Sequence, residues 1–79
     1  MHVGEAIDVL VSFGMPYRIK PVKFKWSGRS IAVKEITYTW KSKEGLKDIY
    51  HFSITDGGTL FELSFDTSSL LWRLESLEA

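Results

Sequence analysis

The sequence predicts an all-β domain: a six-stranded antiparallel meander that curls into a small barrel or half-barrel. Apolar and polar residues alternate in successive short stretches, which is the period of a half-buried strand. Turns rich in Gly, Ser and Asp separate these stretches. β-Branched and aromatic residues dominate them, including 3 Trp, 3 Tyr and 5 Phe in a chain of 79 residues. Residues 1–79 are therefore expected to form one domain, without internal repeats or linkers.

The first strand is predicted within residues 5–13, EAIDVLVSF. Its alternating apolar face consists of Ile7, Val9, Val11 and Phe13. A helix is the alternative, because a stripe of Ala6, Ile7, Leu10 and Val11 has helical spacing. The β-branched residues and the absence of a strong N-cap favour the strand. Pro16 ends it, since proline cannot continue a ladder of backbone hydrogen bonds.

Residues 20–40 are predicted as the central hairpin. In its first arm Val22, Phe24 and Trp26 share one face, and Lys23 and Lys25 share the other. The Ser27-Gly28 pair has the composition of a two-residue hairpin turn, in which glycine supplies positive φ.

The second arm of this hairpin changes phase. Ile31 and Val33 belong to one alternation, whereas Ile36, Tyr38 and Trp40 belong to the other. An extra residue is needed to change the phase, so a β-bulge is predicted near residues 34–35. One long strand would then serve both halves of a curled sheet.

The remaining chain predicts three further strands. Residues 41–47 form a polar loop with Gly45, and residues 48–55 alternate with Tyr50, Phe52 and Ile54 on the inner face. A turn at residues 56–58 leads to residues 59–65. The inner face of that strand is predicted to be Phe61, Leu63 and Phe65.

The last strand is predicted within residues 70–77, with Leu70, Trp72 and Leu74 facing inward. A terminal helix from Ser69 is the alternative. Its stripe would be Leu70, Leu71, Leu74 and Leu77.

Charge is distributed unevenly along the chain. Residues 17–47 contain nine lysines and arginines but only two acidic residues, a net charge of +7; the remainder carries −7, since the formal total is zero. A basic stripe on a curved sheet can follow phosphates, and neighbouring aromatic rings can stack on bases. The candidate nucleic-acid or partner contacts are Lys23, Lys25, Arg29, Lys34, Trp40 and Lys41, with Tyr17 and Tyr38 as further stacking candidates.

Self-association is the favoured prediction. The predicted outer faces of the strands carry Leu10, Ile49, Leu60, Leu71 and Leu77. Several exposed apolar residues on a small sheet predict an interaction patch, with Leu60 and Leu71 as its candidates. The chain is accordingly predicted to be a non-enzymatic protein-binding module that forms a homodimer, with nucleic-acid binding as the alternative.

The sequence offers no pattern typical of an enzyme. Cysteine is absent, and His2 and His51 are too isolated to indicate a metal site. No nucleophile elbow, histidine-paired nucleophile or phosphate-binding loop is recognisable. No catalytic residue, cofactor or small-molecule substrate is therefore predicted. Without a long apolar stretch or a signal-peptide pattern, the chain is expected to be cytoplasmic and without membrane contact.

One set of residues suggests a family. They are residues 21–29 (PVKFKWSGR), Val33, Trp40, Tyr50, Phe52, residues 61–63, Asp66, Trp72 and Leu74, together with residues 5–9. This pattern resembles a family of short bacterial domains of unknown function, with a Pro-x-x-Phe-x-Trp-x-Gly-Arg hairpin. Ile31 and Phe61 depart from it, since the family more often has an aromatic residue and Tyr there. Members are sometimes encoded beside error-prone DNA-repair polymerases, so the resemblance implies an accessory role in repair. The family has no assigned catalytic residues, so the resemblance implies none in this chain.

Overall fold

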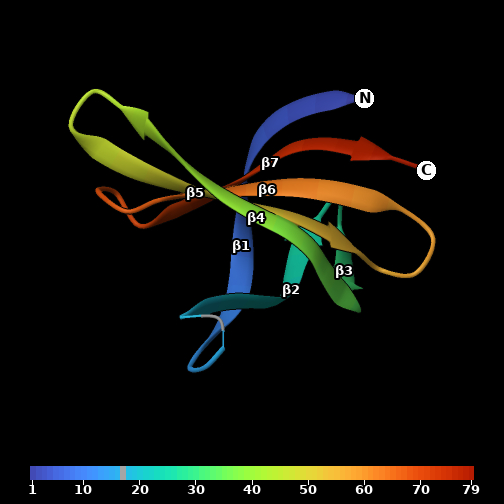
Figure 1. Cartoon of the computed structure of the whole chain (residues 1–79). Helices are drawn as coiled ribbons and strands as arrows, with labels where there is room; N and C mark the ends of the chain where they lie inside the picture. The colour runs from blue at the N-terminus through green and yellow to red at the C-terminus, as the bar shows by residue number, and fades with distance from the viewer. Residues whose placement is uncertain (17) are drawn as a thin grey trace.

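The computed structural model, which describes residues 1–16 and 18–79, contains one antiparallel sheet of seven strands (Figure 1). The strands are β1 (His2–Phe13), β2 (Ile19–Trp26), β3 (Arg29–Ala32), β4 (Glu35–Glu44), β5 (Lys47–Thr55), β6 (Leu60–Asp66) and β7 (Leu71–Glu78). The predicted all-β meander is confirmed, and both stretches with a helical alternative are strands. Within the described residues, no helix has the length and apolar character needed to cross a membrane.

The strand order is β3-β2-β1-β7-β6-β5-β4. The chain starts at the centre of the sheet, runs outward to the β3 edge, crosses to the β4 edge and returns to the centre. The first and last strands are therefore neighbours, with Glu5 opposite Leu74 and Ile7 opposite Trp72. This pairing joins a three-stranded half, β1 to β3, to a four-stranded half, β4 to β7.

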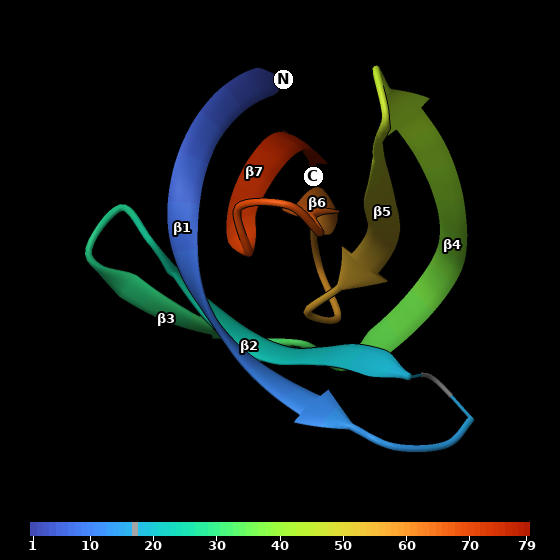
Figure 2. The same cartoon turned by 90° about the vertical axis from the view of Figure 1, so that its left-hand side faces the viewer.

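The two edges of the sheet meet at one end only. β3 ends at Ala32 and β4 begins at Glu35, so the crossing consists of Val33 and Lys34. Val33 N donates to Val22 O at 2.9 Å, and Lys34 N donates to Thr55 O at 2.8 Å, which ties this short connection to both halves. No ladder joins β3 to β4 among the described residues, because the four-residue β3 pairs only with β2. The sheet curls, as Figure 2 shows, but it is not closed into a barrel.

Two predictions about the central hairpin need correction. The phase change near residues 34–35 is the crossing between edges, so the sheet has seven strands rather than six. A bulge lies instead at Thr37, between Ile36 and Tyr38. Because one extra residue reverses the face of everything after it, Ile36 packs against the core while Tyr38 and Trp40 lie on the outer face.

A second irregularity affects β2. The register shifts between Lys23 and Pro21, so Val22 is 37% exposed rather than part of the inner face. The Ser27-Gly28 turn is confirmed, with φ of 54° and 74° at its two central residues. Most of the loop predicted at residues 41–47 belongs instead to the end of β4. The chain turns at Gly45 and Leu46 and continues as β5.

The core lies inside the curl. Its buried residues are Phe24, Ile31, Phe52, Ile54, Phe61, Leu63, Trp72 and Leu74. Phe24 of the three-stranded half meets Phe61 of the four-stranded half edge to face, with ring centroids 5.2 Å apart. Trp72 packs against Phe52 and Phe65, so aromatic contacts span most of the interior.

Leu70 differs from its predicted inward position. It occupies the turn between β6 and β7 with φ of 62°, and its side chain is 69% exposed. Leucine in this left-handed region costs about 1–2 kcal/mol, whereas glycine adopts it freely. We therefore expect Leu70→Gly to raise the urea midpoint of unfolding, with Leu46→Gly at the exposed neighbouring turn as the control. A lower midpoint for Leu70→Gly would show that its side chain stabilises the turn.

Candidate protein-interaction groove

A groove of about 440 Å³ lies between the start of β2 and the β4–β5 pair, where the sheet is not closed. The residues that line it are Pro16, Arg18, Ile19, Thr39, Trp40, Lys41, Tyr50, His51 and Phe52. Ile19, Tyr50 and Phe52 belong to the core or pack against it, so the groove is an opening onto the apolar interior. Its volume is within the ~300–1,000 Å³ of typical binding sites.

The bulge at Thr37 decides which β4 side chains face this groove. Thr39 is the partner of Phe52, and Lys41 is the partner of Tyr50. Cross-strand partners project from the same face, so Thr39 and Lys41 lie on the inner face although both are exposed. Without the extra residue, Tyr38 and Trp40 would occupy these positions.

The positive charge of the groove is not compensated. Arg18 and Lys41 line it together, and none of the lining residues is acidic. Neither cation has a carboxylate within 4.0 Å among the residues that the structure describes. By contrast, Lys43 Nζ lies 3.3 Å from Asp48 Oδ1, an ion pair without hydrogen-bond geometry.

Unpaired backbone borders the groove on both sides. β4 is the last strand of the sheet, so one edge of Glu35–Glu44 has no ladder partner among residues 1–16 and 18–79. β3 pairs with β2 only over Lys23 to Trp26, which leaves Ile19 to Pro21 beyond its reach. Such edges present free N–H and C=O groups to another extended chain.

The predicted nucleic-acid residues are distributed over several surfaces. Lys23 and Lys25 project from the outer face of β2, where Lys25 is opposite Asp8. Arg29 shares a separate hollow with Asp56, and the Lys34 side chain lies against Gly57. Only Trp40 and Lys41 line the groove, and Tyr17 lies outside the described residues. The structure therefore does not assemble one continuous basic stripe.

The predicted self-association residues are also separated. Leu60 is opposite Glu78 at one end of the β6–β7 pair, and Leu71 is opposite Asp66 at the other. The two leucines are thus about 20 Å apart at ~3.3 Å per residue. Two further residues of the predicted outer patch are not exposed, because Ile49 is 9% exposed and Leu77 packs against the core.

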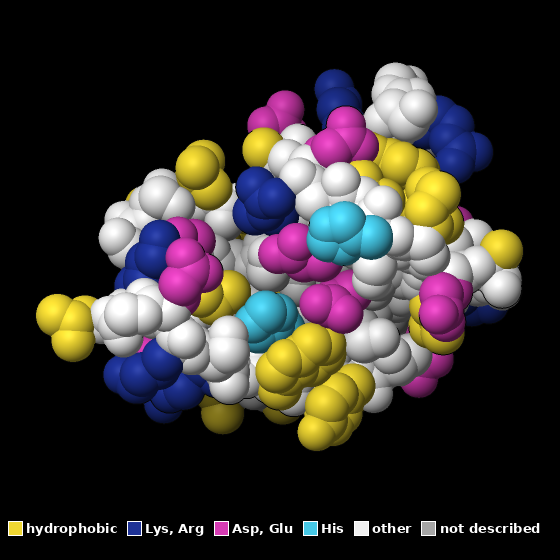
Figure 3. Space-filling view, turned by 90° about the horizontal axis from the view of Figure 1, so that it is seen from above, with side chains coloured by type: hydrophobic (Ala, Val, Ile, Leu, Met, Phe, Trp, Pro, Cys, Tyr) yellow, Lys and Arg dark blue, Asp and Glu magenta, His cyan; other side chains and the backbone are white. Residues whose placement is uncertain are grey.

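Sequence reasoning missed a polar and aromatic cluster on the outer face of β4 and β5. Trp40 stacks on His51 with centroids 4.9 Å apart and on Tyr38 with centroids 5.6 Å apart. His51 Nε2 lies 2.7 Å from Ser42 Oγ, whereas its Nδ1 is 3.9 Å from Glu62 Oε2. Figure 3 shows histidine and acidic side chains gathered on one face. The sequence does carry a signal for this cluster. A two-residue turn at Gly45 and Leu46 fixes the register between β4 and β5, and that register places Trp40 opposite His51.

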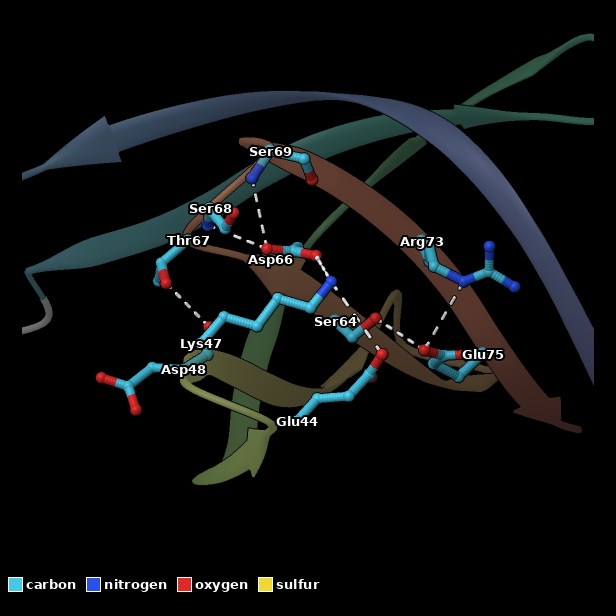
Figure 4. Close-up of polar contacts among 10 residues, drawn as sticks. All are labelled: Glu44, Lys47, Asp48, Ser64, Asp66, Thr67, Ser68, Ser69, Arg73 and Glu75. Carbon is cyan, nitrogen blue, oxygen red and sulfur yellow. Dashed lines mark hydrogen bonds and ion pairs between the residues drawn. The ribbon is translucent and has the colours of Figure 1, made fainter.

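A second polar cluster ties the β4–β5 hairpin to the turn after β6 (Figure 4). Lys47 Nζ donates to Asp66 Oδ2 at 3.0 Å. That hydrogen bond and the Asp66 charge raise the pKa of Lys47. The same hydrogen bond, followed by the backbone N–H of Ser68, lowers the pKa of Asp66. Thr67 Oγ1 donates to Asp48 O at 2.8 Å, so this end of the sheet is internally bonded while the groove is open.

The fold and groove define a class: a small, curled but open β-sheet domain with a cationic, apolar-floored groove at its unpaired edges. Comparison of the chain with protein-family models, curated proteins and solved structures found no match.

Proposed function

We propose that this chain is a small non-enzymatic interaction module that binds an extended segment of a partner protein by adding it as a strand to β4. The observation that supports this most directly is the unpaired β4 edge beside the groove. In strand addition, backbone hydrogen bonds supply affinity and pockets for alternate side chains supply specificity.

The groove fits this mode of recognition. A strand paired with β4 directs every second side chain to the face that carries Thr39 and Lys41. One such side chain would cover the partly buried Tyr50 on the apolar floor. Near Pro16 in the chain, Phe13 at the end of β1 is 77% exposed, and Met15 in the following loop is 88% exposed. These side chains offer further apolar surface for the same partner.

The test is selection of displayed 12-residue random peptides on the immobilised chain, followed by hydrogen exchange of the complex. Strand addition predicts slower exchange of backbone amides in β4. Thr39→Trp, which fills the groove from an exposed position, should abolish binding. Tyr38→Trp is the control, because Tyr38 is exposed on the outer face of the same strand and does not line the groove.

Two results would contradict the proposal. One is the recovery of no binding peptide from repeated selections. The other is protection confined to strands other than β4, or equal loss of binding in both tryptophan variants. Self-association and nucleic-acid binding, which the sequence predicts, stay predictions, and the experiments below separate them from peptide binding.

A further inference from the structure

We infer that the segment bound in the groove is acidic: an extended stretch with one large apolar residue and a carboxylate on either side of it, on the same face. This inference rests on the proposed function and names the chemistry of its partner. It follows from the positive charges of the groove, from its apolar floor, and from the two-residue spacing of side chains on one face of a strand.

The two positive charges lie on opposite sides of the groove. Arg18 immediately precedes β2, and Lys41 belongs to β4, so the two cations line the groove from different halves of the sheet. In the free chain, water solvates both. A strand laid along β4 would displace part of that water, and an unpaired cation would then oppose binding. Carboxylates on the incoming strand remove this cost and form charge-assisted hydrogen bonds.

The floor requires an apolar residue between those carboxylates. Ile19 and Tyr50, which are only partly buried, offer apolar surface that only a hydrophobic side chain covers favourably. Side chains that face one side of a strand recur every second residue. The matching pattern is therefore Glu-x-Leu-x-Glu, in which all three named side chains point toward the groove.

Other occupants fit less well. A single-stranded nucleic acid needs a track of positive charge along its backbone, whereas the groove offers two cations, and Lys23 and Lys25 line a separate hollow. A second copy would present its own β4, whose Lys41 carries the same charge as the groove. Charge complementarity thus favours an acidic protein segment.

The experiment uses three fluorescein-labelled peptides of alternating Thr and test residues. Their groove-facing positions are Glu-Leu-Glu, Gln-Leu-Gln or Lys-Leu-Lys. Anisotropy titrations with the full chain should rank the Glu peptide first. The Gln peptide should bind about tenfold or more weakly, since a hydrogen bond to a charged group contributes more than one to a neutral group. The Lys peptide should not bind measurably.

Variants of the chain assign the effect to the groove. Arg18→Glu combined with Lys41→Glu should reverse the ranking, so that the Lys peptide binds best. Lys23→Glu combined with Lys25→Glu makes the same charge change on the outer face of β2 and should alter each affinity less than about twofold.

The outcomes distinguish this inference from the proposed function. Equal binding of the Glu and Gln peptides would overturn the acidic partner while strand addition stands. Failure of all three peptides, with no binder from random selection, would overturn both. Tight binding of a thymidine oligonucleotide that is lost in the Arg18→Glu, Lys41→Glu variant would overturn both in favour of nucleic acid. If the chain had twice the monomer mass in solution and did not bind the Glu peptide, the occupant of the groove would be a second copy of the chain.

Discussion

Leu63→Ala is expected to lower the free energy of unfolding by about 2–5 kcal/mol. Leu63 is fully buried at the middle of β6, between Phe52 on β5 and Leu74 on β7. Removing its side chain loses apolar burial and leaves a cavity that three neighbouring strands cannot fill. Domains of this kind have a total stability of about 5–15 kcal/mol, so the variant should be largely unfolded at modest urea concentrations. Urea titration followed by tryptophan fluorescence measures the change.

Leu60→Ala is the matched control for Leu63→Ala. Leu60 begins the same strand but is 45% exposed. Its truncation removes little buried surface and should change the free energy of unfolding by less than about 1 kcal/mol. If Leu60→Ala were as destabilising as Leu63→Ala, burial of apolar side chains inside the curled sheet would not be what stabilises the domain.

Phe24→Ala is expected to cost about 3–5 kcal/mol. Phe24 is 1% exposed and belongs to β2, yet its ring meets Phe61 of β6 at a centroid distance of 5.2 Å. It therefore holds the three-stranded half against the four-stranded half. Because the two halves share one core, circular dichroism and tryptophan fluorescence should report a single transition at lower urea.

Phe13→Ala provides the corresponding control. Phe13 ends β1 with a side chain that is 77% exposed. Its loss should change the unfolding free energy by about 0.5 kcal/mol or less. Separate transitions for the two spectroscopic signals in Phe24→Ala would mean that the halves fold independently, contrary to the shared core.

Strands and turns were predictable because their signals are local. The alternation of Phe61, Leu63 and Phe65 specifies the inner face of β6, and Ser27-Gly28 specifies a tight turn. The crossing at Val33 and Lys34 was not predictable, because a bulge and a change of sheet edge leave the same shift in alternation. Only the hydrogen bonds of these residues to opposite halves distinguish the two.

The groove was less predictable than the strands. Lys41 was among the candidate contacts, but the bulge at Thr37 decides that it faces the inner side and that Trp40 does not. Arg18 entered the sequence analysis only as part of the basic segment. Its place opposite Lys41 depends on how far the sheet curls, which is a property of the whole chain rather than of any short stretch.

The position of β1 beside β7 has a consequence for folding kinetics. Every other ladder joins strands that follow one another in the chain through short connections, so those hairpins can form early. The β1–β7 ladder instead pairs Ile7 with Trp72, and its formation must close a loop that contains nearly the whole chain. Refolding is therefore expected on a timescale of about milliseconds to seconds, with the meeting of the first and last strands as its slow step.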